Sequence, residues 1–426
     1  MGDEWLRATT PGVEHGQLLR DLAKAYEQAQ AGGTPPASLP RWVAESWNQS
    51  RAQGVNPNSS GCPVLSQAEL QRRLQESRLA PAWNTLWTGL EGVASGERMV
   101  EVTDGDGYVL LRKGDNNSKI RRLANEVGFV VGARMDMGAM GTSGIAVALE
   151  RRVPVQIPGP CHWRRNQHGV NCTAVPVLDL RRKNRPLAVI NVTGLGPFGH
   201  PDTLRLVRVV ASNVRRELAT AHSKKVERLC ADAGSLDRVT GWALVTDRDG
   251  WVATSHRMPT PPDRVALPEG RHTQPGQRPL PDFGRCVLEP LPGGWLIRHE
   301  VPGEDDPVIR TVLDLRHPRQ WGITVTGPNV RWQHQLTLRQ AEILLLLATA
   351  QPNGRTGAEL AEDLYGAPKT SALRTDICRL REYTGGLLDH RPYRFSTTVR
   401  VAVQRPATRT RLLPDSTAPG VIRLRR

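Results

Sequence analysis

The spacing of apolar residues divides the chain into helical and strand-like stretches. Leucine and alanine recur every three or four positions across residues 16–31, which is typical of one buried helix face. Residues 40–51 and 66–89 continue this helical pattern. From residue 99 to 193 the pattern changes to short apolar runs, and the Asp104-Gly105-Asp106-Gly107 turn between two of them predicts a β-hairpin. The first half of the chain is therefore predicted to be an α+β module.

A long amphipathic pattern follows this module. Thr203 to Leu229 carries its apolar residues on one broad stripe, which predicts either packed core or a two-helix interface. We expect a dimer contact there. Residues 238–330 then hold short β-rich runs between Pro- and Gly-rich turns, which predicts a small β module in which we find no chemistry.

The last stretch has the elements of a winged helix-turn-helix. Thr337 and Thr356 precede two apolar-periodic runs and are suited to cap helices that end near residues 349 and 365. A third helix is predicted over residues 370–383, and residues 387–403 are predicted to form a β-hairpin. Three helices followed by a hairpin predict a winged helix-turn-helix.

The third of these helices has a polar side suited to contact DNA. Leu373, Ile377 and Leu380 fall on one buried face, and short polar side chains flanked by two arginines fall opposite. Short side chains let a helix approach base edges, while arginine binds guanine or phosphate. The predicted DNA contacts, three of them on the hairpin, are Lys369, Thr370, Ser371, Arg374, Thr375, Cys378, Arg379, Arg391, Tyr393 and Arg394. The simplest alternative for each arginine is a solvated surface side chain.

Charge and composition point to the same class of partner. The chain has 426 residues, with 57 Lys and Arg against 42 Asp and Glu, and its net charge is +15. A basic balance favours a polyanion such as nucleic acid. The sequence has no Gly-Lys-Ser or Gly-Lys-Thr step and no hydrolase, zinc-protease or kinase motif, so neither an enzyme nor a cofactor is predicted. It also has no apolar run of about 18 residues and no secretory signal, which predicts a cytoplasmic protein that does not contact membranes.

Two cysteines and two histidines lie close together in the sequence. Cys161, His162, His168 and Cys172 are residue types that bind zinc or respond to oxidants. Their spacing is not a usual zinc pattern, and Cys172 begins a predicted strand, where a thiol is commonly a small buried hydrophobe. No metal site is therefore predicted, and a redox role stays an alternative.

Sequence motifs in the C-terminal stretch add a family resemblance. They are a leucine-rich first helix, the runs AELAEDLYG (358–366) and ICRLR (377–381), and a final PYRF (392–395). Together these motifs resemble the C-terminal DNA-binding domain of OmpR-like response regulators. The resemblance implies that the third helix enters the major groove and that the hairpin contacts the minor groove. The sequence departs from that family because no phospho-acceptor receiver domain precedes these motifs.

Five collinear motifs in the first half carry a second resemblance. They are ESWNQSRAQGVNP (45–57), VTDGDGYVLLRKGD (102–115), GAMGTSGIAVALERRVPVQI (138–157), CTAVPVLD (172–179) and LAVINVTG (187–194). This region resembles the GAF-containing N-terminus of acetoin-catabolism-type regulators, without their AAA+ ATPase. The resemblance implies a ligand pocket between a sheet face and the segments that cover it. The candidate lining residues, of which the methionines could equally be ordinary core, are Met137, Met140, Thr142, His162, Trp163 and His168.

The predicted fold class is α+β multidomain, with a GAF-like sensor, a small β-rich middle module and a C-terminal winged helix-turn-helix. This order of domains is similar to that of actinobacterial GAF-domain regulators. The predicted boundaries are 1–39 for an N-terminal helix and linker, 40–202 for the helical entry and sensor, 203–232 for a dimerisation helix, 233–330 for the β-rich module, 331–403 for the winged helix and 404–426 for a disordered basic tail.

The predicted function is that of a ligand-responsive transcriptional regulator. It is expected to form a homodimer and to bind double-stranded DNA and an unidentified small-molecule effector. Two alternatives stay open. One is a signalling scaffold whose C-terminal helices bind protein, and the other is a thiol-dependent GAF-type enzyme or redox sensor.

Overall fold

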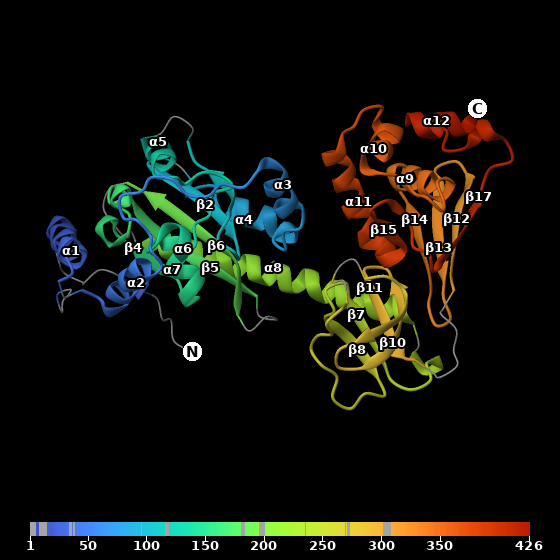
Figure 1. The fold of residues 1–426 in the computed structure, drawn as a ribbon, viewed down its shortest axis with the longest axis horizontal. Helices are drawn as coiled ribbons and strands as arrows, with labels where there is room; N and C mark the ends of the chain where they lie inside the picture. The colour runs from blue at the N-terminus through green and yellow to red at the C-terminus, as the bar shows by residue number, and fades with distance from the viewer. Residues whose placement is uncertain are drawn as a thin grey trace. The chain divides into compact units, whose positions relative to one another are not determined.

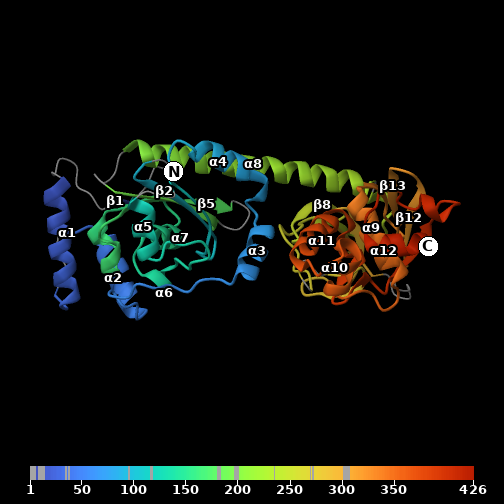
Figure 2. The ribbon, with the colours of Figure 1, turned by 90° about the horizontal axis from the view of Figure 1, so that it is seen from above.

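The chain folds into two compact units, residues Met1–Ala221 and His222–Arg426, each of which mixes helices and β-sheets (Figure 1, Figure 2). The structure is a computed structural model that describes residues 6–7, 15–33, 36, 39–94, 96–115, 119–179, 184–195, 201–234, 236–268, 270, 273–300 and 308–426. Residues 1–5 and 8–14 of the predicted N-terminal segment, and parts of several loops, lie outside this description.

The first unit is built on one six-stranded sheet of order β1-β4-β5-β6-β2-β3. Its neighbours pair antiparallel except for β1 with β4, and β2 and β3 form the predicted hairpin. The strands are β1 (Leu6–Arg7), β2 (Arg98–Asp104), β3 (Val109–Lys113), β4 (Val155–Ile157), β5 (Asn171–Asp179) and β6 (Arg185–Gly194). The α-helices are α1 (His15–Gln30), α2 (Arg41–Ala52), α3 (Gln67–Gln75), α4 (Trp83–Leu90), α5 (Lys119–Glu126), α6 (Met137–Met140), α7 (Gly144–Arg151) and the first part of α8 (Pro201–Ala233).

Different helices cover the two faces of this sheet. Successive strand residues point to opposite faces, so Val100 and Val102 of β2 lie on one face and Met99 and Glu101 on the other. The valines belong to a hydrophobic cluster with residues of α4 and α8. Met99 belongs to a second cluster with residues of α1, α2, α5 and α7. Figure 2 shows α4 and α8 along one side of the sheet and α5 and α7 along the other.

The second unit contains two larger sheets and a helical group. One sheet has the order β8-β7-β11-β10-β9, the other has the order β14-β13-β12-β17, and β15 and β16 form a small hairpin. The strands are β7 (Ala243–Asp247), β8 (Val252–His256), β9 (Gly276–Leu280), β10 (Gly284–Leu291), β11 (Gly294–His299), β12 (Ile309–His317), β13 (Gln320–Thr326), β14 (Arg331–Leu336), β15 (Leu388–His390), β16 (Tyr393–Phe395) and β17 (Val399–Gln404). The helices are α9 (Leu338–Thr349), α10 (Gly357–Tyr365), α11 (Thr370–Thr384) and α12 (Pro419–Arg425).

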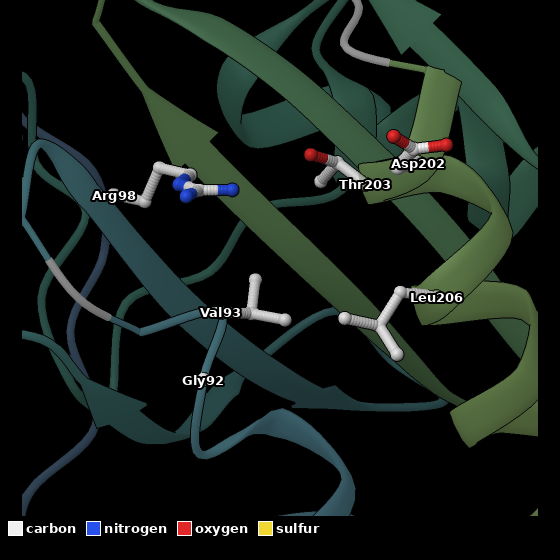
Figure 3. Close-up of a pocket in the computed structure, with 6 residues that line it drawn as sticks. All are labelled: Gly92, Val93, Arg98, Asp202, Thr203 and Leu206. Carbon is white, nitrogen blue, oxygen red and sulfur yellow. The ribbon is translucent and has the colours of Figure 1, made fainter.

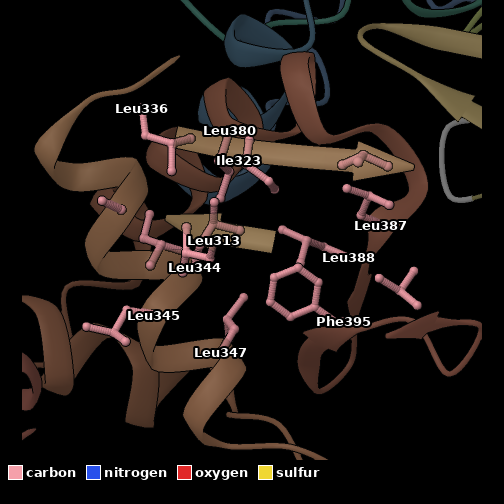
Figure 4. Close-up of a cluster of buried hydrophobic side chains, with 14 of the residues drawn as sticks. Leu313, Ile323, Leu336, Leu344, Leu345, Leu347, Leu380, Leu387, Leu388 and Phe395 are labelled. Carbon is pink, nitrogen blue, oxygen red and sulfur yellow. The ribbon is translucent and has the colours of Figure 1, made fainter. Parts of the chain in front are cut away.

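The starts of α9 and α10 follow directly from the sequence. Thr337 and Thr356 each accept a hydrogen bond from the backbone N–H three residues on, and the side chains of Gln340 and Glu359 complete two capping boxes. Gly366 ends α10 in the left-handed conformation, with φ of 68°. The leucines of α9 are buried among side chains from β12, β13, α11 and the β15–β16 hairpin (Figure 4).

The second unit departs from the predicted domain boundary at residue 330. β14 lies beyond that boundary, yet it pairs with β13, and β12 lies in the same sheet. The apolar residues of β12 and β13 supply the surface against which α9 packs, and Leu291 and Leu296 of the other sheet share the same hydrophobic cluster. The predicted 233–330 and 331–403 segments are therefore parts of one compact unit.

The prediction of a disordered tail over residues 404–426 is wrong. This segment contains α12, and Leu412, Leu413 and Val421 are buried in the core of the second unit. Arg423 also forms an ion pair with Asp363 of α10. The segment is rich in arginine, but burial of these three apolar side chains packs it against the core.

The predicted hairpin over residues 387–403 forms only in part. β15 and β16 pair with each other, but β17 pairs in parallel with β12 of the larger sheet. Val399 is buried, and Val401 and Val403 pack against the core. These alternating valines suit a strand with one buried face, which explains why β17 joins the sheet that α9 covers.

Candidate nucleic-acid and ligand sites

The predicted division of α11 into a buried and an exposed side is confirmed. Leu373, Ile377 and Leu380 are buried. Arg374 and Arg379 are exposed, together with Lys369, Thr370 and Ser371 at the start of the helix. Thr375 and Cys378 are half-buried, and the Thr375 hydroxyl donates to the carbonyl of Ser371 at 3.3 Å. The second unit thus leaves the arginine-flanked side of α11 accessible to a partner.

The three predicted contacts on the hairpin differ in their surroundings. Arg391 is exposed, whereas Tyr393 and Arg394 are half-buried. Tyr393 exchanges two backbone hydrogen bonds with Arg355, each 2.8 Å long. Arg394 forms an ion pair with Asp389 at 2.9 Å. Arg391 is therefore better placed than Arg394 to contact a polyanion.

Polar contacts fix α11 against its neighbours. The Arg381 guanidinium donates to the carbonyls of Leu388 and Asp389 at 3.2 and 3.1 Å, which ties α11 to β15. At its other side, Asp376 accepts a hydrogen bond of 2.7 Å from the Tyr365 hydroxyl of α10. α10, α11 and the hairpin are thus held together as one group.

The six predicted ligand-lining residues come together, but side chains and helices fill the space between them. Met140, Thr142, His162 and Trp163 are buried beneath α1 and α2. The Thr142 hydroxyl lies 2.7 Å from the Ser46 hydroxyl and 3.0 Å from that of Ser50, both on α2. These positions are core of the first unit in this structure.

Aromatic residues of α1 and α2 complete this packing. The Tyr26 hydroxyl donates to the carbonyl of Trp163 at 2.7 Å, and the Tyr26 ring lies edge-on to the His168 ring with centroids 4.6 Å apart. The Trp47 indole N–H donates to the carbonyl of Cys161 at 2.9 Å. Burial lowers the pKa of His162 to about 3, so its imidazole is neutral at physiological pH.

A groove of about 760 Å³ lies beside this filled region. Its volume is in the range typical of small-molecule sites. The Tyr108 ring lies between two arginines, with the guanidinium carbons of Arg73 and Arg134 4.3 and 5.9 Å from the ring centroid. Met137 belongs to both the predicted pocket and the groove. The full lining is Gln49, Gln53, Arg73, Gly105, Asp106, Tyr108, Arg134, Asp136, Met137, Gly138, Ala146, Leu149 and Glu150.

The charges at the rim of the groove are largely paired with one another. Arg73 forms ion pairs with Asp104 and Asp106 at 2.6 and 3.0 Å. Arg134 pairs with Asp136 at 2.6 Å. Among the lining residues, Met137, Ala146 and Leu149 are apolar. The groove therefore has a mainly polar lining with a few apolar side chains, and most of its charges are paired with one another.

A buried polar row beneath α7 escaped the sequence analysis. Asn191 of β6 and Glu101 of β2 are direct cross-strand neighbours, and both are fully buried. The Asn191 amide donates to a Glu101 carboxyl oxygen at 2.9 Å, and the Thr193 hydroxyl donates to the other oxygen at 3.0 Å. Burial raises the pKa of Glu101 to about 8 despite these hydrogen bonds.

The four Cys and His residues do not form a metal site. No group of three or more His, Cys, Asp or Glu that could hold a metal ion occurs in the described part of the chain. Burial raises the pKa of the Cys172 thiol to about 12 and raises the pKa of Cys161 further. Both thiols are therefore protonated and poorly nucleophilic at neutral pH.

Two apolar side chains of α8 are exposed on the first unit. Leu206 is 42% and Val209 55% exposed, and they lie three residues apart on one side of the helix. Leu206 also lines a hollow of about 200 Å³ with Gly92, Val93, Arg98, Asp202 and Thr203 (Figure 3). Among the described residues, no helix, α8 included, has both the length and the apolar character that a membrane span requires.

Comparison with known proteins gives one family match that lies within the first unit and several partial matches to single proteins. A model of the family described as MimR, N-terminal domain, matches residues 20–216. The "uncharacterized 47.3 kDa protein in thcA 5'region" of Rhodococcus erythropolis is 31% identical over 228 residues, which are 51% of this chain and 51% of that protein.

Two further relatives are named "propane 2-monooxygenase operon transcriptional activator MimR". The protein of Mycolicibacterium smegmatis is 25% identical over 50% of this chain and 36% of its own length. The protein of Mycolicibacterium goodii is 26% identical over 48% of this chain and 34% of its own length. The chain thus spans about half the length of the first of these curated relatives and about a third of the other two.

Among solved structures, a chain of the E. coli DhaR(N)–DhaL complex is 17% identical, with a TM-score of 0.39 over 62% of this chain and 100% of that chain. Pseudomonas aeruginosa HmgR is 14% identical, with a TM-score of 0.23 over 48% of this chain and 98% of that chain. At these TM-scores neither likeness establishes a shared fold. The sequence match to the MimR N-terminal domain family over residues 20–216 is therefore the comparison that bears on what this chain does.

Proposed function

We propose that the protein is a ligand-responsive regulator of transcription, in which the first unit senses a small molecule and the second unit binds operator DNA through α11. Two relatives that match about half of the chain are named transcriptional activators, and the family match covers most of the first unit. No relative reported above is named as an enzyme.

The observation that carries the DNA-binding proposal is the exposed side of α11. Arg374 and Arg379 are exposed there, while Leu373, Ile377 and Leu380 hold the opposite side in the core. Three helices and a hairpin in this order are the elements expected of a winged helix-turn-helix, which supports the proposal. In such an arrangement the third helix enters the major groove, where arginine binds guanine and short polar side chains allow close approach.

Selection of bound fragments from genomic DNA tests this proposal. The full chain is expected to enrich a discrete set of sequences, and an Arg374→Ala/Arg379→Ala variant is expected to lose that enrichment. An Arg285→Ala variant serves as control, because Arg285 is exposed on β10 and forms an ion pair with Glu300. Enrichment of the same sequences by the α11 variant would overturn the assignment of α11.

We place the effector site in the groove that contains Tyr108 and Met137. Its few apolar side chains beside polar groups and paired charges suit a small, uncharged molecule that has both an apolar part and a hydrogen-bonding group. Because two relatives are named activators of a propane 2-monooxygenase operon, short-chain hydrocarbons and their alcohols are the first effectors to try.

A groove-filling substitution tests this site. A Cβ at Gly138 would lie 3.5 Å from the nearest atom, the Gln53 Oε1, so Gly138→Leu places a side chain at the groove without a severe clash. An effector that raises the melting temperature of the wild-type chain is expected not to raise that of Gly138→Leu. Gly61→Leu is the control, because a Cβ there meets no atom within 4 Å. Equal stabilisation of all three proteins would place the effector elsewhere.

The scaffold alternative differs from DNA binding in its dependence on salt. Neutralising about five phosphates gives a log–log slope of affinity against salt near −4 to −5, whereas a protein interface has a weaker dependence. The thiol-dependent alternative requires a reactive thiolate, which the buried and protonated Cys161 and Cys172 do not supply.

A further inference from the structure

Three arginines lie in one row across the open face of the β14-β13-β12-β17 sheet. The strand register places Arg331 of β14 beside Thr326 of β13, Thr326 beside Arg310 of β12, and Arg310 beside Arg400 of β17. All four side chains are exposed. Because neighbouring strands are about 4.8 Å apart, the row spans about 14 Å. We call Arg310, Arg331 and Arg400 the arginine row.

This row lies on the face of the sheet that points away from α9. Ile309 and Thr311 flank Arg310 along β12 and are buried, so Arg310 points to the opposite face. α9 packs on the buried face, where Leu313 and Ile323 join its leucines in one cluster. The arginine row is therefore a surface separate from the core that supports α11.

The charges of the row are not compensated within the fold. No described residue forms an ion pair with Arg310, Arg331 or Arg400. Arg310 and Arg400 are direct neighbours on adjacent strands, and like charges in such positions repel each other and destabilise the pairing. Asp314, farther along the same face, forms an ion pair with Arg316 at 2.7 Å and does not pair with the arginine row. An anionic partner would relieve this repulsion.

The rest of the open face consists of short or amide side chains and one carboxylate, that of Asp314, which is paired with Arg316. Behind the arginine row, the register aligns Gln333, Thr324, Val312 and Ala402 in a second row, and Gln335, Gly322, Asp314 and Gln404 in a third. Trp321 and Trp332 of the same strands are buried on the other face. The open face thus combines positive charge with hydrogen-bond donors and carries no aromatic side chain in these rows.

This composition discriminates among anionic partners. Protein interfaces depend on aromatic or large apolar anchors, and single-stranded nucleic acids stack on aromatic side chains, neither of which these rows provide. Phosphates of a duplex are bound by Arg, Thr and Gln side chains without such anchors. We infer that the open face of this sheet is a second, sequence-independent binding surface for the phosphate backbone of double-stranded DNA, with the arginine row as its charged centre.

Salt-dependent binding to a duplex of arbitrary sequence tests this inference on the full chain. Affinity is measured by fluorescence anisotropy over a range of KCl concentrations for the wild type and for Arg310→Gln/Arg331→Gln/Arg400→Gln. Each phosphate contact contributes about 0.9 to the log–log slope, so the triple variant is expected to reduce the slope by about 2 to 3. An unchanged slope would overturn the inference.

The matched control removes the same charge elsewhere in the second unit. Arg264, Arg285 and Arg319 are exposed; Arg264 donates to the carbonyl of Asp249, and Arg285 and Arg319 form ion pairs with Glu300 and Asp415. Arg264→Gln/Arg285→Gln/Arg319→Gln is expected to change the slope by less than 1. An equal reduction by both triple variants would show that net charge, rather than the arginine row, sets the affinity, and would contradict the proposed surface.

A second variant guards against loss of folding. Arg310→Glu creates an opposite-charge pair with Arg400 on the neighbouring strand, so its melting temperature is expected to be no lower than that of the wild type. It is still expected to weaken binding to the arbitrary duplex at least fivefold at low salt. Arg374→Ala/Arg379→Ala is expected to lose sequence enrichment but to keep the contribution of the arginine row to the salt slope. Failure of the α11 proposal and failure of this inference therefore give different results.

Discussion

Glu101 is a fully buried carboxyl whose pKa differs strongly from its ordinary value. It lies on a buried face of the first unit's sheet, its carboxyl accepts hydrogen bonds from Asn191 and Thr193, and burial raises its pKa to about 8. A carboxyl with this pKa is mostly protonated at neutral pH. The folded chain therefore binds a proton at Glu101 that the unfolded chain, with an ordinary pKa, releases.

This proton predicts how the stability of the first unit depends on pH. Between about pH 4.5 and pH 8 the folded state holds the proton and the unfolded state does not, so the free energy of unfolding falls as the pH rises through this window. Glu101→Gln is expected to flatten this dependence. Hydrogen-exchange protection of β2 amides, measured across the window, isolates the first unit. Exposed Glu97→Gln is the control, and a wild-type-like slope in Glu101→Gln would contradict the assignment.

Arg374 is the residue on which base recognition by α11 depends most. It is exposed on the side of α11 opposite Leu373 and Ile377. Arg374→Ala is expected to weaken binding to the selected operator by about 1 to 3 kcal/mol and to relax specificity at one base position. Gel-shift titration against single-base operator variants measures both effects. Full operator affinity in Arg374→Ala would exclude base recognition by this residue.

At the scale of elements, sequence periodicity was most informative where one element has one buried side. Thr337, Thr356 and Gly366 mark the ends of α9 and α10 because capping is a local interaction. The fate of β17 and α12 was not predictable in this way. Their partners β12 and α10 lie far away in the sequence. The local pattern predicted β17 as part of a hairpin, and the arginine-rich composition predicted disorder where α12 forms.

The same contrast applies to the candidate sites. The two sides of α11 followed from a helical repeat, because 100° per residue fixes which positions are opposite. The predicted ligand residues lie together, but no local pattern indicates that Tyr26 and Trp47, from two distant helices, pack against them. The arginine row also has no local signal, because strand register brings Arg310, Arg331 and Arg400 together from three separate strands.

α12 is expected to stabilise the second unit. Val421 is fully buried in the core, whereas its neighbour Ile422 is 36% exposed. Val421→Ala is expected to lower the free energy of unfolding by about 1.5 to 3 kcal/mol, because it removes two buried methyl groups and leaves a cavity in the core. Ile422→Ala, measured by urea denaturation in parallel, should cost less than half as much. Equal effects would mean that α12 does not pack on the core in solution.

At the scale of the whole molecule, the exposed apolar residues of α8 predict self-association. Leu206 and Val209 lie on one side of this helix and are available for a helix-to-helix contact with a second copy. Leu206→Glu/Val209→Glu is expected to shift the chain from dimer to monomer in sedimentation velocity experiments at micromolar concentration. Val64→Glu, at a position that is 55% exposed, is the control. A monomeric wild type would contradict the predicted dimer.

The parallel pairing of β12 with β17 has a consequence for biosynthesis. β12 ends at His317 and β17 ends at Gln404, so the sheet that supports α9 stays one strand short while the residues between these two strands are translated. Nascent chains stalled before Val399 would therefore present an open sheet edge, which favours aggregation.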